Sequence, residues 1–192
     1  MSGSVQEILD FWFADGPDTF RQAWFQRDDA FDAEIRARFG HLVVPAREGA
    51  LDALSQTREG ALALILMLDQ FPRNLFRGTA EAFASDAHAQ ALVRQLVLKE
   101  RLDQRLTPTQ RGFLYLPFEH AESMEMQNLS VTLYEGMRDI AEEAVPGGTI
   151  DYAWRHWHII RRFGRFPHRN AALRRESTPA ELAYLAQPGA GF

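Results

Sequence analysis

A run of eight consecutive apolar residues, 61–68, is the feature that most constrains the fold of this chain. The run ends at Asp69, and Pro72, which follows Phe71, is expected to break the regular helix. A helix that is apolar on all sides has to be buried, so this segment predicts a central helix surrounded by other elements. The run is about half as long as a bilayer crossing requires, and we therefore expect no membrane association.

Most other segments carry the three- and four-residue apolar spacing of amphipathic helices. Residues 5–14, 85–102 and 123–144 each place apolar side chains on one helical face. Residues 20–39 continue the same spacing, and Gly40 predicts the end of that helix. No sustained alternation of apolar and polar residues indicates a strand. The sequence therefore predicts an all-α fold, with short connections that favour stacked antiparallel helical hairpins.

Two threonine-proline pairs predict helix starts. Residues 107–110 and 178–181 each combine a capping threonine, a proline at the first helical position, and Gln or Glu three residues after the cap. The second start predicts a short last helix that ends at Leu185. Another predicted helix begins at Thr149 and reaches Gly164.

Length and composition are typical of one globular domain. The 192 residues predict a single helical domain with frayed ends at 1–4 and 187–192. The chain has no cysteine, which excludes disulfides, thiolate catalysis and zinc–thiolate sites. No basic region followed by an apolar segment begins the sequence, so we expect a cytoplasmic protein.

Basic residues are concentrated in one segment, although the chain has a net charge of −5. Residues 155–175 contain seven arginines and no acid. Guanidinium groups suit carboxylates and phosphates, so this segment predicts binding of a small anion. The remainder of the chain is acidic and would repel a polyanion, and we therefore expect no nucleic-acid partner.

A short motif occurs twice, where an apolar helical pattern meets a proline. Residues 69–74 read Asp-Gln-Phe-Pro-Arg-Asn, and residues 165–170 read Arg-Phe-Pro-His-Arg-Asn. A buried Asp69 needs a nearby cation to stay charged, and we expect Arg165 to supply it. Asp69 is then either half of a structural ion pair or a general base, and structural pairs perturb carboxylates as active sites do.

A second polar segment follows Pro117, which is expected to kink or restart a helix. A restart places Glu119, His120 and Glu122 in the first turns, with the two carboxylates on one face. A carboxylate beside an imidazole is sufficient for acid–base chemistry, but acidic residues also simply stabilise a helix start. No Glu-x-x-His or His-x-x-x-His spacing occurs, so we predict neither a metal nor another cofactor.

Several longer motifs together resemble a known family. They are Trp24-Phe25 with Phe31-Asp32, residues 69–74, residues 116–122 and residues 162–170. From Ile8 to Leu185 the chain resembles the bacterial family catalogued as domain of unknown function 924. The resemblance implies an all-helical fold of the tetratricopeptide-like superhelical type, and it implies no activity, substrate or cofactor.

We predict that three corners of the fold, residues 69–77, 117–122 and 162–170, converge around one pocket. The leading hypothesis is that this pocket binds, and in its stronger form turns over, a small anionic metabolite. The candidates for proton transfer are Asp69, Glu119 and His120. The candidates for ligand binding are Arg73, Asn74, Arg77, Glu122, Arg162, Arg165, His168, Arg169 and Asn170. The alternative is a scaffold that binds a peptide or protein partner on a concave helical surface; the oligomeric state stays open.

Overall fold

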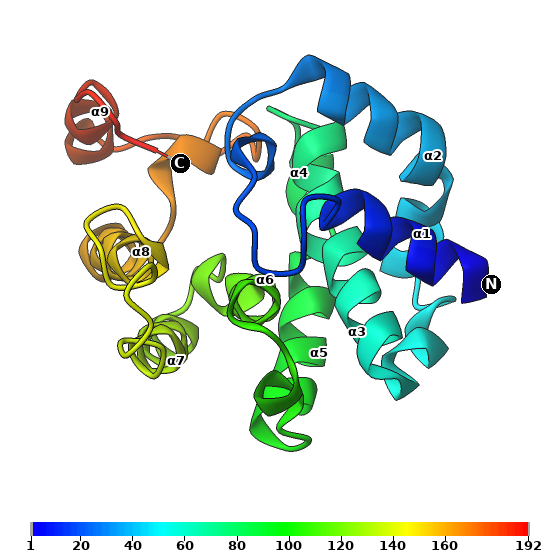
Figure 1. Cartoon of the computed structure of the whole chain (residues 1–192). Coiled ribbons are helices and arrows are strands. Elements are labelled where there is room, and N and C mark those ends of the chain that lie inside the picture. The colour runs from blue at the N-terminus through cyan, green and yellow to red at the C-terminus, as the bar shows by residue number, and fades with distance from the viewer. Residues whose placement is uncertain (1, 192) are drawn as a thin grey trace. The chain divides into compact units, whose positions relative to one another are not determined.

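The computed structural model describes residues 2–191, with side chains from residue 5 onward. Helices and turns account for this part of the chain, and no strand occurs within it (Figure 1). The prediction of an all-α fold is therefore confirmed, whereas the tetratricopeptide-like superhelix stays a prediction.

The chain divides into two compact units. Unit 1 comprises residues 1–77 and 81–117, and unit 2 comprises residues 78–80 and 118–192. The extent of a single domain over 1–192 stays a prediction. Helix α6 (Pro108–Glu119) begins in unit 1 and contributes its last two residues to unit 2.

Unit 1 is built around the predicted central helix. Its α-helices are α1 (Ser2–Trp12), α2 (Asp29–Arg47), α3 (Arg58–Ile65), α4 (Phe71–Leu75), α5 (Asp86–Leu98) and most of α6. Single 3₁₀ turns cover Gln22–Trp24, Asp52–Gln56, Ala80–Phe83 and Leu102–Arg105. Every residue from Gly60 to Gln70 is buried, which confirms the prediction of a buried central helix. The Trp12 ring packs against a group of aromatic rings: Trp24, Phe31, Phe71 and Phe113.

The central helix does not stop at Pro72. A π-helical turn, Leu66–Gln70, joins α3 to α4, and the Phe71 N–H donates to the Leu66 carbonyl five residues back. Pro72 then occupies the first turn of α4, where a missing N–H costs least. The Ser85 hydroxyl donates to the buried Leu68 carbonyl over 2.6 Å. A side chain from the next helix segment therefore satisfies a carbonyl that a regular helix would pair with the missing proline N–H.

Other predicted helix boundaries are wrong as well. The segment 20–39 is not one helix, because a 3₁₀ turn at Gln22–Trp24 precedes the start of α2 at Asp29. α2 passes through Gly40 and ends at Arg47, because an interior glycine costs only about 1 kcal/mol. α6 continues through Pro117 rather than restarting there, since it ends two residues later and little of the helix depends on the lost bond. α7 (Met124–Glu135) is shorter than the predicted segment 123–144, and turns follow it up to residue 148.

Unit 2 contains α7, α8 (Thr149–Phe163) and α9 (Pro179–Leu185), with a 3₁₀ turn at Pro167–Arg169. α7 and α8 pack along each other. Gly164 ends α8 in the left-handed conformation, φ +71°, as predicted for a glycine C-cap. Thr178 and Glu181 form the predicted capping box, and α9 has the predicted bounds.

The fraying expected at both chain ends stays a prediction. α1 includes residues from Ser2, whereas residues 187–191 contain no helix. Met1 and Phe192 lie outside the described residues. Within residues 2–191, no helix is both long enough and apolar enough to cross a membrane.

Candidate functional site

A group of titratable side chains surrounds the buried ring of Phe166 in unit 2. We call Glu119, His120, His156, His168 and Arg169, together with this ring, the Phe166 cluster. The His156 ring meets Phe166 edge-on at 5.5 Å, and the His168 ring lies 5.6 Å from it. The Arg169 guanidinium lies over the Phe166 ring, 4.4 Å from its centre. Ionisable groups gathered in a buried environment are typical of functional sites, so this cluster is the first candidate site.

Glu119 and His156 form a buried pair within the cluster. Glu119 is the last residue of α6, and His156 lies on the buried face of α8. The His156 Nδ1 atom lies 3.0 Å from Glu119 Oε1 and 2.9 Å from the Tyr152 carbonyl oxygen. Two acceptors at one ring nitrogen place a proton on Nδ1. A carboxylate that fixes an imidazole in this way prepares it as a general base.

The other two histidines of the cluster lie close to this pair. The centre of the His120 ring is 6.0 Å from that of His156. Burial lowers the pKa of His168 to about 3; Arg169, His156 and His120 act in the same direction, and Glu122 acts in the opposite one. His168 is therefore neutral near pH 7, where it can exchange hydrogen bonds but does not add charge to the cluster.

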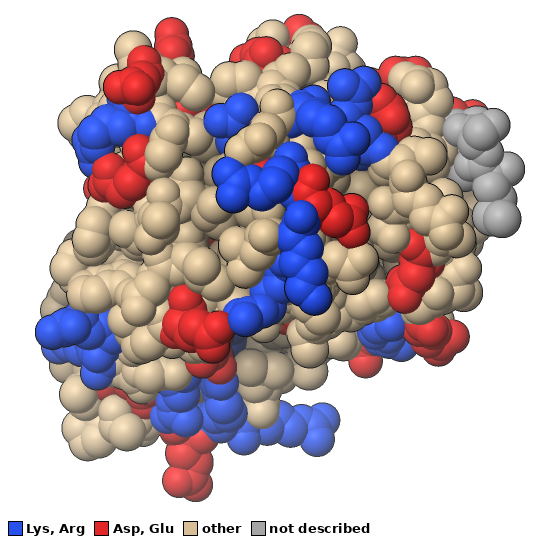
Figure 2. All heavy atoms as spheres, turned by 90° about the horizontal axis from the view of Figure 1, so that it is seen from below, with Lys and Arg blue, Asp and Glu red and all other residues tan. Residues whose placement is uncertain are grey.

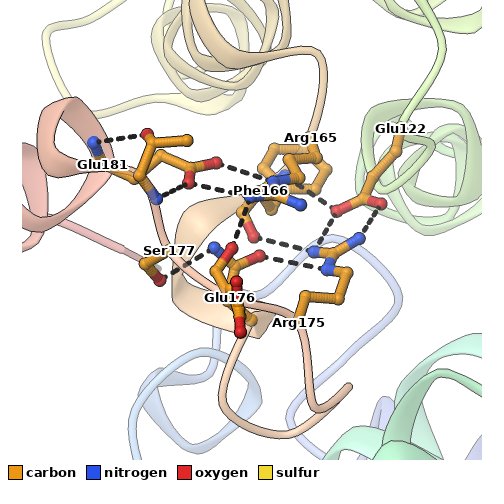
Figure 3. Close-up of polar contacts among 9 residues, drawn as sticks. Glu122, Arg165, Phe166, Arg175, Glu176, Ser177 and Glu181 are labelled. Carbon is orange, nitrogen blue, oxygen red and sulfur yellow. Dashed lines mark hydrogen bonds and ion pairs between the residues drawn. The ribbon is translucent and has the colours of Figure 1, made fainter.

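Glu122 and Arg175 hold the backbone of Phe166 in place (Figure 3). Phe166 donates its N–H to Glu122 Oε1 over 2.7 Å. Arg175 donates to both carboxylate oxygens of Glu122, over 2.6 and 2.9 Å, and to the Phe166 carbonyl over 3.2 Å. Burial raises the pKa of Glu122, but the hydrogen bonds from Arg175 and from Phe166 outweigh it and the net shift is downward. Glu122 is thus committed to positioning Phe166.

Arg165 is a second brace of the same loop (Figure 3). It donates to both oxygens of the buried Glu181 carboxylate, over 2.7 and 2.9 Å, and to the Glu176 carbonyl over 2.8 Å. The Arg165 hydrogen bond, with help from the Thr178 N–H, lowers the pKa of Glu181 to about 2. Arg165 therefore does brace a buried carboxylate, but the expected pairing with Asp69 is wrong, since Glu181 takes that position.

Asn170 and Arg162 complete the predicted arginine corner. Buried Asn170 donates to the Ser177 hydroxyl and accepts from Arg175, so it ties the two ends of the loop together. Arg162 is exposed and stacks on Phe163 at 4.7 Å. Among residues 2–191 it makes no hydrogen bond or ion pair, and it lines an open depression of about 490 Å³ beside Arg165 and α9.

The Asp69 corner lies in unit 1 and has its own network. Arg73 lies 3.3 Å from Asp69 Oδ1, donates to the Asp69 carbonyl over 2.7 Å, and donates to both oxygens of Asp86 over 3.0 and 3.1 Å. The Gln70 amide donates to the other Asp69 oxygen over 2.5 Å. Burial lowers the pKa of Arg73, but Asp69 and Asp86 more than compensate and hold it above its usual value. The cation beside Asp69 is thus Arg73, which lies only four residues further along the chain.

Asn74 and Arg77 both bind Asp32 of α2. The Asn74 amide donates over 2.7 Å, and Arg77 donates to both oxygens over 2.8 and 2.9 Å. Burial raises the pKa of Asp32, but the bonds from Arg77 and Asn74 outweigh it and lower the pKa overall. This arrangement joins α4 to α2, as a structural brace would.

The structure thus brings two of the three predicted corners together within unit 2, namely the segments 118–122 and 162–170. The corner 69–77 belongs to unit 1, and its convergence with the other two stays a prediction. Glu119 and Glu122 do not share a face at the start of a helix, because Glu119 ends α6 and Glu122 lies in the following loop.

Two important residues of this region were not among the predicted site residues. His156 falls on the apolar face of α8 with Ala153 and Ile160, and a polar residue at helical spacing on an apolar face is the signal that could have found it. Arg175 gives no such signal, since its partner Glu122 lies 53 residues earlier. No group of three or more His, Asp or Glu side chains within the described part of the chain is arranged to hold a metal ion.

The comparisons with known proteins now assign the chain to a family. The family model described as "Bacterial protein of unknown function (DUF924)" matches residues 8–189. The chain belongs to the DUF924 family. A solved structure described as "Protein of Unknown Function ATU0120 from Agrobacterium tumefaciens" is 38% identical to this DUF924 chain, with a TM-score of 0.84. The match covers 96% of the DUF924 chain and 98% of the Agrobacterium chain. No curated protein matches. The resemblance read from the sequence motifs is confirmed; family membership indicates the fold but no activity.

Proposed function

We propose that this DUF924 chain binds a small anionic metabolite at the Phe166 cluster and exchanges a proton with it. The observation that supports the proposal most is the buried Glu119–His156 pair, in which a carboxyl oxygen and a backbone carbonyl both lie within hydrogen-bond distance of the imidazole Nδ1. Any buried histidine needs a hydrogen-bond partner, and the Tyr152 carbonyl alone would suffice; the additional carboxyl group of Glu119 is the feature that suits acid–base chemistry.

Each member of the cluster has a role in this proposal. His156 exchanges the proton, and Glu119 stabilises its imidazolium form. Arg169, which is buried against Phe166, supplies the positive charge for the anion. His120 is the second candidate for proton transfer, because its ring borders His156. Asp69 belongs to unit 1 and has no role at this cluster; proton transfer by Asp69 stays a separate prediction, and its network with Arg73 and Gln70 favours a structural role.

The first test is a thermal-shift screen of the purified chain against phosphorylated, carboxylated and amino-acid metabolites. A ligand at one hundred times its dissociation constant adds about 2.7 kcal/mol of stability, which a melting curve readily resolves. We expect the shift to disappear in Arg169→Met and to weaken in Glu119→Gln, each compared with its own ligand-free melting curve. His158→Gln is the matched control, because His158 is an exposed histidine of the same helix.

Proton transfer needs a separate measurement, since binding alone does not show it. An NMR spectrum of the imidazole nitrogens should show His156 protonated at Nδ1 in the free protein, and Glu119→Gln should alter this signal. A metabolite that binds should then exchange a carbon-bound proton with solvent deuterium faster in the wild type than in His156→Gln. A screen without hits contradicts the proposed site, and so does a hit whose binding survives Arg169→Met, Glu119→Gln and His156→Gln.

The alternative function, a scaffold for a peptide or protein partner, draws support from another surface of unit 2. There the side chains of Tyr152 and Trp154 on α8 are 40% and 37% exposed. Large exposed aromatic side chains are more typical of interaction surfaces than of the remaining protein surface.

A further inference from the structure

The outer face of α8 carries a stripe of aromatic and basic side chains. Trp154, Trp157, His158 and Arg161 follow the spacing i, i+3, i+4 and i+7, so they lie along one side of the helix. We call these four residues the α8 stripe. The two indole rings are 5.5 Å apart, and the imidazole of His158 lies 5.1 Å from one and 6.0 Å from the other. The stripe is separate from the buried face of α8 that carries His156.

Hydrogen bonds to α7 fix the two indoles in place. Trp154 donates its Nε1–H to Glu135 over 2.8 Å, and Trp157 donates to Asn128 over 2.7 Å. The polar atom of each ring is therefore satisfied within the protein, while part of each ring stays accessible to solvent. A partner that covers these rings pays little to order them, since their rotamers are already fixed.

A small depression with an apolar part adjoins the stripe, and the charged residues Arg138 and Asp151 also line it. It has a volume of about 290 Å³, and Val145, Pro146 and Ile150 line it next to Trp154. Val145 is half exposed. A depression of this size is smaller than most metabolite pockets, and it suits a single aliphatic or aromatic side chain of a larger partner.

The charges around the stripe indicate what such a partner carries. Arg138 and Arg155 have acidic partners of their own, Glu135 and Asp151. Arg161 instead stacks on Trp157 at 5.1 Å, and Arg162 stacks on Phe163. Neither of the two makes a hydrogen bond or an ion pair with another residue in the range 2–191. Their N–H groups are therefore available, and a carboxylate is the group that satisfies them best.

We propose that the surface formed by the α8 stripe, Arg162 and the adjoining depression binds an acidic peptide segment of another protein. One apolar side chain of the peptide enters the depression against Trp154, and neighbouring Asp or Glu residues pair with Arg161 and Arg162. Trp and Arg are the residue types that most often dominate binding energy at protein interfaces. This inference does not depend on the Phe166 cluster, since no residue of the cluster takes part.

Acidic side chains on the same surface argue against a nucleic acid as the partner. Glu135 and Asp151 lie beside the stripe and the depression, where a phosphate backbone would meet them. Acidic and basic side chains are also interspersed on the face drawn in Figure 2. A peptide can place its few carboxylates at the two available guanidinium groups and avoid these acids, whereas a polyanion cannot.

The test begins with selection from a displayed library of random peptides on the full chain. Enriched peptides are synthesised with a fluorescent label, and their dissociation constants are measured by fluorescence polarisation. We expect enriched peptides to combine Asp or Glu with one Leu, Ile or Phe. We expect Trp154→Ala and Arg161→Gln each to raise the dissociation constant about tenfold or more. Arg174→Gln, which changes an exposed arginine outside this surface, should change it less than twofold.

Several results would overturn the inference. They are a selection without enrichment, enriched peptides that lack acidic residues, and binding that both substitutions leave unchanged. A labelled single-stranded DNA that binds as tightly as the peptides and competes with them would show a general polyanion surface instead. If Trp154→Ala lowers the melting temperature, two milder variants replace it. Trp154→Phe keeps the apolar contact and should retain most of the binding. Arg161→Gln changes an exposed residue and should still weaken binding; unchanged binding by Arg161→Gln would overturn the inference.

Discussion

Replacing Arg73 by methionine separates the two interpretations of the Asp69 corner. Methionine keeps much of the length and apolar volume of the arginine stem but removes the guanidinium. In the wild type, this group contacts the carboxylates of Asp69 and Asp86 and the carbonyl of Asp69. The Asp69 side chain is 1% exposed and that of Arg73 is 18% exposed, so solvent does little to replace the lost contacts.

We expect Arg73→Met to lower the free energy of unfolding by about 3–5 kcal/mol, the usual cost of removing one partner of a buried ion pair. The cost arises mainly at Asp69, which must then stay charged without its neighbouring guanidinium or take up a proton. The hydrogen bond from Gln70 persists and moderates the loss. Asp86 contributes less, since it is closer to solvent.

Urea denaturation followed by circular dichroism measures this change. The double variant Asp69→Asn/Arg73→Met should cost about 1–3 kcal/mol less than the sum of the two single variants, because the buried charge is then gone. Arg58→Met is the matched control, since Arg58 pairs with Glu59 in solvent within the same unit. That exposed pair should contribute less than about 1 kcal/mol.

A different result would refute the structural interpretation of this corner. If Arg73→Met is neutral or stabilising in the ligand-free protein, the charges at Asp69 and Asp86 are a strained arrangement kept for a ligand. Additive single substitutions would also contradict it, because they would show that Asp69 and Arg73 do not depend on each other.

Three further predictions concern local features of the fold. Ser85→Ala should destabilise the protein by about 1–3 kcal/mol in thermal or urea unfolding, because the buried Leu68 carbonyl loses its donor; a loss below a few tenths would contradict the role given to Ser85. The pKa of His168 is about 3 in the folded state and near 6.5 when unfolded, so the unfolded state binds more protons between these values. Stability should therefore fall as the pH drops from about 6.5 toward about 3, and His168→Gln should have a flatter profile in unfolding experiments across this range. Gly60→Ala should unfold at a clearly lower temperature, since its new Cβ would lie 2.1 Å from the Leu54 carbonyl oxygen; an unchanged melting temperature would contradict this packing.

Features of the fold that depend on nearby residues could be predicted from the sequence. The start of α9 is one example, because Thr178 and Glu181 satisfy each other's backbone within four residues. The end of α8 at Gly164 is another, since only the local backbone conformation decides it. The buried central helix could be predicted from its uninterrupted apolar run, because a helix without a polar face has no side that suits solvent.

The effects of the prolines could not be predicted in the same way. Pro72 was expected to break the regular helix, but the chain continues through a π-helical turn and into α4. This is possible because Ser85, 17 residues from Leu68, donates to a carbonyl in the bend. Nothing in the local sequence indicates that donor. The cost of a proline in a helix therefore depends on tertiary contacts that a local rule does not contain.

The arginine-rich segment shows the same limit for the candidate site. The clustering of seven arginines indicated anion chemistry, but a residue type does not say which anion each arginine meets. Arg165 and Arg175 meet Glu181 and Glu122, carboxylates that lie 16 and 53 residues away, and each becomes a brace. A guanidinium that already holds a carboxylate in bidentate geometry has little left to offer a ligand. Anion binding by this segment thus depends on the arginines that the protein's own acids do not occupy, and exposed Arg161 and Arg162 meet that condition.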